Sequence, residues 1–135
     1  MKIVTHMITD EIYESVNDIG NKLILDTRQR EEKTSLSPVE SVLAALASCA
    51  AVDIVVMLKK RKKEIEKFTI ETDGTRQESA PRYFTKIHCR YTVTSPNVTE
   101  EELQKSAALA LEKYCSVGRS LKAEITFSVQ VVRPL

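Results

Sequence analysis

The hydrophobic and polar positions along the chain predict three short strands, a long apolar helix, two further strands, a second helix and a last strand. Three N-terminal segments are rich in β-branched and aromatic residues, at 2–8, 11–16 and 23–25. Residues 68–72, 83–93 and 123–131 alternate apolar and polar positions, as half-buried strands do. Strands and helices in separate blocks predict the α+β fold class.

The most apolar segment has a well-defined helix start. Ser37 is placed to be the N-cap, Pro38 fits the first helical position, and Glu40 completes a capping box. The pattern predicts a helix that continues to about Glu66. Its first five turns are apolar on nearly every side, so the helix needs cover all round. One small domain has little material for that, and we therefore expect a partner subunit.

The second half of the chain has a similar helix start. Thr99 and Glu102 form another capping box, which predicts a helix to about Tyr114. A turn is expected over 74–81, between two strands, and another over 115–120, before the last strand.

Length, charge and composition narrow the class of protein. With 135 residues, the chain is expected to form a single domain over 1–135. Its 20 basic and 19 acidic residues give a net charge of +1, so no nucleic-acid partner is expected. Residues 39–58 are long enough to span a membrane, but burying Asp53 there would cost ~2.5–3.5 kcal/mol. With three cysteines and no signal peptide, we expect a cytoplasmic protein without a membrane partner.

The three cysteines differ in context. Cys89 lies on the apolar face of its strand, which predicts an inert core thiol. Cys49 and Cys115 lie on or beside the predicted helices. No Cys-x-x-Cys occurs, which argues against thioredoxin chemistry and ribbon-type zinc sites. A metal site of Cys49, Cys115 and His88 lacks a fourth ligand, and His88 is predicted to face away from the core, so no metal or cofactor is expected.

Redox chemistry at Cys49 requires a thiolate. Burial raises the pKa of a thiol, and an ionised Asp53 one helical turn further on would raise it more. A cationic partner is therefore expected. Arg28 and Arg30, in the polar segment before the helix, are the best sources, and the pattern does not choose between them.

At these residues the chain resembles the family of osmotically inducible protein C and organic hydroperoxide resistance protein (OsmC/Ohr). The most specific matches are the Ser37-Pro38 helix start, with a cysteine eleven residues after the proline, and the segment Tyr-Cys-Ser-Val-Gly-Arg-Ser-Leu-Lys-Ala-Glu-Ile-Thr-Phe that contains Cys115. The resemblance covers nearly the whole chain. It implies an OsmC-like fold, with antiparallel sheets around a long buried central helix, in an intertwined homodimer whose active sites lie at the subunit interface.

The resemblance also implies thiol-dependent reduction of organic hydroperoxides. Cys49 is then the peroxidatic cysteine, which becomes a sulfenic acid, and Cys115 the resolving cysteine, which forms a disulfide with it. An external dithiol, of lipoyl type for example, reduces that disulfide. Arg28 matches the arginine that activates the thiolate, although the match needs one extra residue in the loop and leaves Arg30 as the other candidate.

Departures from the family pattern leave alternatives open. The glutamate that directly follows the helix-starting proline elsewhere is Val39 here, and Glu40 comes one position later. Glu40 either replaces it as the arginine's partner or only closes the capping box. The chain thus resembles a less characterised OsmC-like branch. A dimeric binding or stress-response protein without peroxidase turnover is the alternative function, and handling of sulfide or persulfide by the same cysteines is a third.

Overall fold

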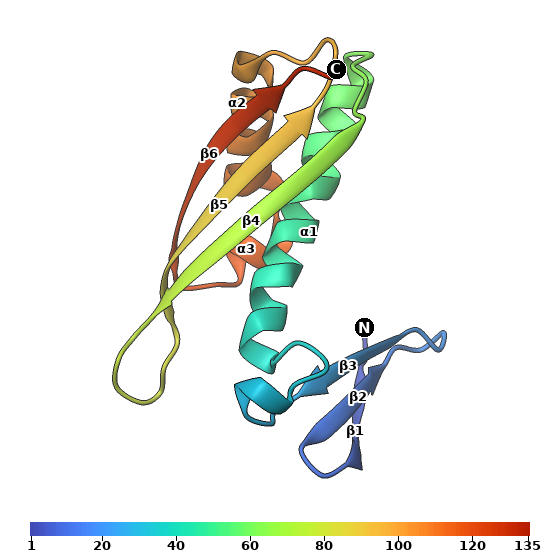
Figure 1. Cartoon of the computed structure of the whole chain (residues 1–135), viewed down its shortest axis with the longest axis vertical. Coiled ribbons are helices and arrows are strands. Elements are labelled where there is room, and N and C mark those ends of the chain that lie inside the picture. Colours follow the sequence, from blue (N-terminus) through green and yellow to red (C-terminus); the bar gives the residue numbers. More distant parts are fainter. The chain divides into compact units, whose positions relative to one another are not determined.

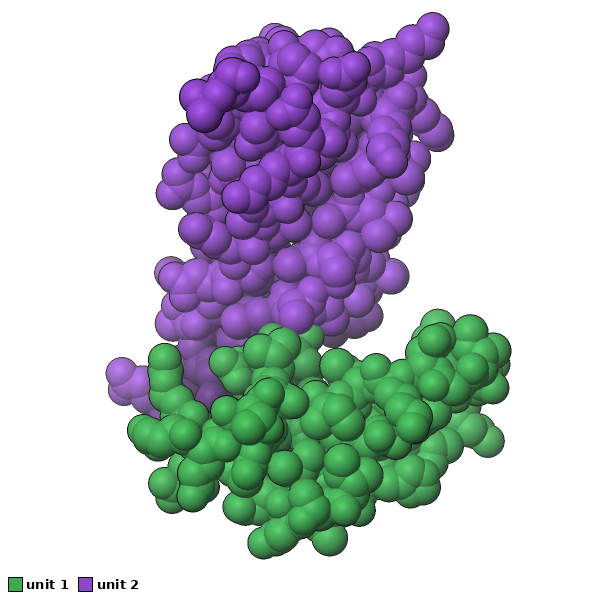
Figure 2. Space-filling view, turned by 45° about the vertical axis from the view of Figure 1, so that its right-hand side comes forward, with its two compact units in different colours: residues 1–42 green, residues 43–135 purple.

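The computed structural model describes residues 1–135, which form two compact units, residues 1–42 and residues 43–135 (Figure 2). The element order is that predicted, with both sheets and the long helix, and the α+β fold class is confirmed. That residues 1–135 act as a single domain stays a prediction.

The first unit contains a three-stranded antiparallel sheet. Its strands are β1 (Val4–Thr9), β2 (Ile12–Val16) and β3 (Lys22–Asp26), in the order β1-β2-β3. All of β1 is exposed, and Asp26 is the one buried residue of the sheet. Several large apolar side chains of this unit are exposed as well: Ile3, Val4, Met7, Ile8, Ile19, Leu23 and Leu36. A short 3-10 turn, η1 (Arg30–Glu32), follows the sheet.

Helix α1 (Pro38–Lys60) begins where the sequence predicts. The backbone N–H of Glu40 donates to the Ser37 hydroxyl at 3.1 Å, and the N–H of Ser37 donates to the Glu40 carboxylate at 2.9 Å, which confirms the capping box. The helix ends six residues before the predicted Glu66. Lys62 adopts a positive φ of 60°, which reverses the chain, and the N–H of Glu66 already pairs with the Thr94 carbonyl.

The second unit contains a mixed three-stranded sheet in the order β4-β5-β6. β4 (Lys67–Arg76) and β5 (Phe84–Thr94) pair antiparallel, whereas β6 (Glu124–Val132) pairs with β5 in parallel. The expectation of purely antiparallel sheets is therefore wrong for β6. Helix α2 (Glu100–Leu109) carries the chain back to the starting end of β5, so that β6 runs in the same direction.

The hairpin between β4 and β5 turns later than predicted, because β4 continues through Gly74. A Cβ atom at this position would overlap the ring of Phe84, so glycine leaves the room in which that ring packs against β4.

Helices α1 and α2 pack on one face of this sheet and form the core with it (Figure 1). Helix α1 contributes one fully buried stripe at a spacing of four residues, Leu46, Ala50, Ile54 and Leu58. Its opposite side stays open, with Val52 63% and Val56 45% exposed. The expected burial of α1 on every side is thus not reached within one chain. By length and composition alone, α1 would suffice to span a membrane, a test that core helices of soluble proteins also pass.

The predicted helix over 99–114 is divided in the structure. Its capping box at Thr99 and Glu102 is confirmed, but after α2 the chain widens into a π-type turn, η2 (Ala110–Tyr114). A four-residue helix, α3 (Ser116–Arg119), follows directly. Cys115 stands between these two segments, at the point where the helical path bends.

Candidate active site

Cys49 lies on α1, about three turns after its start, and is half-buried. It directly precedes Ala50 of the buried stripe, so its side chain lies at the edge of the core. Its Sγ is 3.8 Å from the hydroxyl oxygen of Ser116. The long helix thereby places this thiol next to the first residue of α3.

Cys115 is held from the other side by the bend between η2 and α3. Its backbone N–H donates to the Ala110 carbonyl at 2.7 Å, the bond that closes the π-type turn. Its Sγ accepts the backbone N–H of Gly118 at 3.3 Å, so the thiol caps α3. The residue is 3% exposed. Backbone geometry therefore fixes this sulfur in the core.

The pKa of the Cys49 thiol is lowered from its ordinary value. The main cause is the backbone N–H of Val117, and the hydroxyl of Ser116, the thiol of Cys115 and the N–H of Ser116 add to it against the effect of burial. The expectation of a cationic partner for this thiolate stays a prediction, and the second unit adds a contribution that the sequence did not indicate. Backbone N–H groups at the first turn of α3 favour the anion.

Cys115 shows the opposite shift. Burial raises the pKa of its thiol, and a negative charge on Cys49 raises it further, while the Gly118 N–H acts against both. The two thiols thus share one site in which the pKa of Cys49 is lowered and the pKa of Cys115 is raised. When the pKa values of two neighbouring titratable groups are shifted in opposite directions, the two groups can take different roles in a reaction.

Gly118 lies close to the core side chains around Cys115. A Cβ at this position would lie 3.3 Å from Leu46 Cδ1, closer than most such contacts, and 3.4 Å from Cys115 Sγ, about an ordinary contact distance. The roles of Ser116, Val117 and Gly118 are absent from the sequence-based prediction. The sequence predicts only a turn over 115–120, and the structure shows that this turn is the short helix α3, which starts directly after Cys115.

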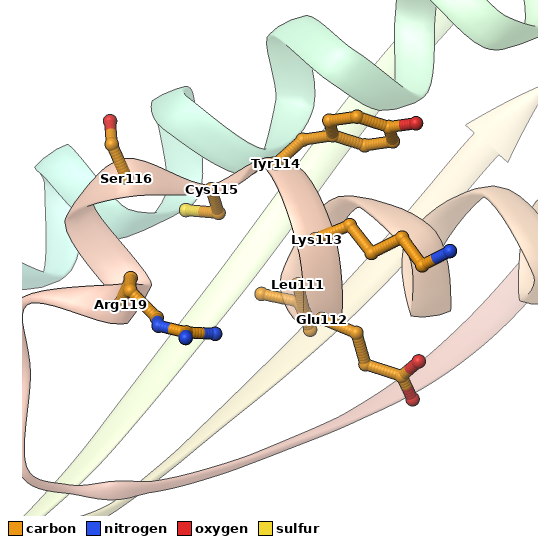
Figure 3. A pocket seen from close by; sticks show the side chains of 7 residues that line it. All are labelled: Leu111, Glu112, Lys113, Tyr114, Cys115, Ser116 and Arg119. Carbon is orange, nitrogen blue, oxygen red and sulfur yellow. The ribbon is translucent and has the colours of Figure 1, made fainter.

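A surface hollow of about 460 Å³ adjoins the bend. Figure 3 shows the side chains that line it, with the Cys115 sulfur and the Arg119 guanidinium both inside the curve of the chain. Cationic and anionic groups are mixed among its lining residues, Leu111, Glu112, Lys113, Tyr114, Cys115, Ser116 and Arg119.

Arg28 belongs to the first unit, where a buried aspartate holds it. Arg28 Nε donates to Asp26 Oδ1 at 3.0 Å and Nη2 to Oδ2 at 2.7 Å, a two-point ion pair. The Thr34 N–H donates to the same carboxylate at 3.0 Å. The hydrogen bonds from Arg28 hold the pKa of Asp26 well below its usual range, and Asp26 in turn raises the pKa of Arg28. Sequence reasoning missed Asp26, because it ends a strand like any turn-forming aspartate.

Glu40 and Arg30, the other two candidate residues of the first unit, have different surroundings. Glu40 closes the capping box, and its pKa is lowered mainly by the backbone N–H of Ser37. Within this unit the partner of Arg28 is therefore Asp26. Arg30 is exposed in η1 and takes part in none of the four ion pairs of the chain.

The structure thus brings together two of the sequence-predicted residues, Cys49 and Cys115, in the second unit. Arg28 and Glu40 lie in residues 1–42 and are placed only within that unit. The catalytic roles of all four stay predictions.

The remaining side chains singled out from the sequence lie where predicted. Cys89 is fully buried in the core. His88 lies on the opposite, exposed face of the sheet, with hydrogen bonds to the hydroxyls of Thr126 at 2.7 Å and Ser128 at 3.0 Å. No group of three or more His, Cys, Asp or Glu side chains is arranged to hold a metal ion.

Comparison with known proteins finds a matching family model, relatives that are similar in sequence, and solved structures with a similar fold. The family model described as OsmC-like protein matches residues 31–130. Protein YhfA of Escherichia coli K12 is 32% identical over 115 residues, 84% of each chain. An OsmC-like protein from Mycoplasma pneumoniae has 20% identity and a TM-score of 0.83, covering 97% of this chain and 96% of its own. The organic hydroperoxide resistance protein OhrB of Bacillus subtilis has 18% identity and a TM-score of 0.61, covering 96% of each chain.

Proposed function

Since this chain belongs to the OsmC-like protein family, we propose that it is a thiol peroxidase that reduces organic hydroperoxides, with Cys49 attacking and Cys115 resolving. The observation that carries the proposal is that the fold brings both thiols to one turn: Cys49 Sγ lies 3.8 Å from the Ser116 hydroxyl, and Cys115 Sγ accepts the Gly118 N–H at 3.3 Å. The pKa of Cys49 is lowered there and the pKa of Cys115 is raised. A peroxidatic cysteine needs a thiolate, and a resolving cysteine needs only to be near.

The reaction balances with the two thiols and one dithiol. The Cys49 thiolate attacks the distal peroxide oxygen, the O–O bond breaks, and the alcohol leaves with a proton while Cys49 becomes a sulfenic acid. Cys115 then attacks the sulfenic sulfur and water leaves, which forms the Cys49–Cys115 disulfide. An external dithiol, of lipoyl type for example, restores both thiols and is itself oxidised to a disulfide.

Arg28 is the proposed cationic group of this site. Asp26 fixes its guanidinium at two points, so that the remaining N–H groups are held in a defined direction. Because backbone N–H groups already lower the pKa of Cys49, the proposed contribution of Arg28 is to bind and orient the peroxide oxygens. Glu40 keeps the helix start in place through its capping box.

We further propose that the working form is a homodimer in the cytoplasm. The open side of α1, with Val52 and Val56, and the exposed apolar residues of the first sheet need a cover of similar chemistry. A second copy of the chain supplies such a surface, and the family resemblance implies the same assembly. Sedimentation at several protein concentrations tests this, and a monomer throughout contradicts it.

The function is tested by treating the reduced protein with one equivalent of an alkyl hydroperoxide and mapping its thiols by mass spectrometry. We expect a Cys49–Cys115 disulfide, free Cys89, and loss of peroxide consumption in Cys49→Ser. Cys89→Ser is the matched control, since that thiol is buried away from the surface and should leave the reaction intact. Three free thiols and unconsumed peroxide would favour the binding or stress-response alternative instead.

A further inference from the structure

The surface hollow at the bend between η2 and α3 is bordered by Cys115 but not by Cys49. Its volume of about 460 Å³ lies in the range of small-molecule binding sites. Cys115 is 3% exposed, so the hollow is the solvent-filled space nearest to its side chain that the structure describes. A molecule bound in the hollow therefore approaches the pair of thiols from the side of Cys115.

Arg119 places a positive charge without an ionic partner in this hollow. It lies one helical turn after Cys115, and its backbone N–H donates to the Cys115 carbonyl at 3.0 Å. Its guanidinium lies inside the same curve of the chain as the Cys115 sulfur (Figure 3). The side chain is exposed and takes part in none of the four ion pairs of the chain. Such a guanidinium is available to bind a carboxylate through two parallel hydrogen bonds.

The rest of the lining favours a molecule that is partly apolar and carries a negative charge. Lys113 is a second exposed cation without an ion pair, and Glu112 is the one carboxylate of the lining, so cationic groups are in excess. Leu111 and Tyr114 add apolar contact surface. A short aliphatic chain that ends in a carboxylate matches this combination.

The hollow also bears on which sulfur of the disulfide a reductant attacks. Exposure alone favours Cys49, which is half-buried. The hollow favours Cys115, because a thiolate bound there is next to this residue. The leaving group favours Cys115 as well, since attack there releases Cys49, and a thiol of lowered pKa departs more readily. The hydroperoxide reacts at Cys49, so attack at Cys115 gives the two substrates different points of reaction.

We propose that this hollow binds the dithiol reductant, that Arg119 holds a carboxylate on that reductant, and that its thiolate attacks the disulfide at Cys115. The inference rests on the proposed function and names the substrate class of its reducing step, a small aliphatic dithiol with a carboxylate. A bond forms between the reductant sulfur and Cys115 Sγ, the Cys49–Cys115 bond breaks, and its electron pair goes to Cys49. The second thiol of the reductant then loses its proton and attacks the first reductant sulfur, which releases Cys115 as a thiolate. The reductant departs as a cyclic disulfide, and its two protons go to the cysteine thiolates or to water.

The first test measures reduction alone, with two dithiols that differ in charge. The Cys49–Cys115 disulfide is formed with diamide, so that no peroxidase activity is needed, and its reduction by dihydrolipoic acid and by dihydrolipoamide is followed. Arg119→Gln should slow reduction by the acid about threefold to tenfold and leave the rate with the amide unchanged, because a charge-assisted contact at an open site is lost. Lys122→Gln is the matched control, since it removes an exposed cation that does not line the hollow.

Comparing the two dithiols separates binding from a structural role of Arg119. An equal loss with both dithiols, or no loss with the acid, overturns the proposal. A loss of the same size in Lys122→Gln overturns it too, because the effect then belongs to surface charge in general. If hydroperoxide fails to oxidise the protein while the loss specific to the acid is found, the proposed function fails and the binding site is supported.

The second test locates the attacked sulfur. The protein oxidised with diamide is mixed with mercaptoacetate, a monothiol with a carboxylate, and is quenched with acid at early times, alkylated and mapped by mass spectrometry. We expect the mixed disulfide at Cys115 and the alkyl group at Cys49. The reverse distribution overturns the proposal, and so does a protein in which diamide forms no Cys49–Cys115 disulfide.

Discussion

The two units of the chain secure their candidate site residues in different ways. In residues 43–135, a core of fully buried apolar side chains fixes Cys49 and Cys115, and backbone N–H groups lower the pKa of the first. In residues 1–42, no apolar strand residue is fully buried, and the buried side chain is the carboxylate of Asp26, which holds Arg28.

This difference corresponds to two requirements of the proposed peroxidase reaction. Sulfur chemistry needs fixed distances and a dry environment, which a packed core provides. A peroxide-orienting arginine needs direction more than burial, and one two-point ion pair provides that. The apolar side chains of the first sheet are exposed, and the proposed dimer would cover them with a second copy of the chain.

The largest effect is expected from the core of the second unit. Leu46→Ala removes a fully buried side chain that lies against the Gly118 turn, and such truncations cost about 2–5 kcal/mol of the free energy of unfolding. Leu23→Ala, on the first sheet, is the matched change at a side chain that is 51% exposed. Denaturant unfolding at one protein concentration compares the two. Because the proposed dimer covers the first sheet, we expect a smaller but measurable loss at Leu23, and no loss there would contradict that cover.

A second measurement tests whether Arg28, in the first unit, contributes to the proposed reduction of peroxide at Cys49, in the second unit. Arg28→Met should lower kcat/KM for an alkyl hydroperoxide by roughly tenfold or more, as expected for a lost donor to developing charge. The apparent pKa of Cys49 alkylation should move little, because the Val117 N–H remains. Arg30→Met serves as control two residues away. Equal activity of the Arg28 and Arg30 variants would remove Arg28 from the site.

A third measurement follows the acid stability of the first unit. The folded pKa of Asp26 lies below the value of about 3.9 for a free side chain, so this carboxylate stabilises the fold fully above that pH. The contribution is lost as the pH falls from about 4 towards the folded pKa. Melting temperatures from pH 7 to 2.5 should show the gap between wild type and Asp26→Asn narrowing below pH 4. Asp10→Asn, at an exposed turn, should follow the wild type throughout.

The smallest effect is expected at Ser116. Its hydroxyl is 3.8 Å from Cys49 Sγ and contributes less than the Val117 N–H to the lowered pKa. Ser116→Ala should therefore raise the apparent pKa of Cys49 by less than about half a unit, since a weak hydrogen bond is removed. Alkylation rates between pH 5 and 9 measure this shift. A rise of a full unit or more would make the hydroxyl, rather than the backbone, the main stabiliser of the thiolate.

The sequence by itself determined the features that depend on neighbours along the chain. Both capping boxes, at Ser37 and Thr99, pair residues three positions apart, so the helix starts could be read directly. The burial of Cys89 and the outward side of His88 follow from the alternation of a strand. The two candidate thiols were likewise visible as cysteines in helical contexts.

Only the tertiary structure decided what depends on segments far apart in sequence. The parallel pairing of β6 with β5 and the bond from the Glu66 N–H to the Thr94 carbonyl rest on contacts that no local pattern records. The lowered pKa of Cys49 is the clearest case, because its own helix offers no stabilising group. The N–H of Val117 comes from a turn 68 positions later, which folding brings to the sulfur. Electrostatic interactions act across space rather than along the chain, and the sequence therefore identified the thiol while only the fold showed which groups lower its pKa.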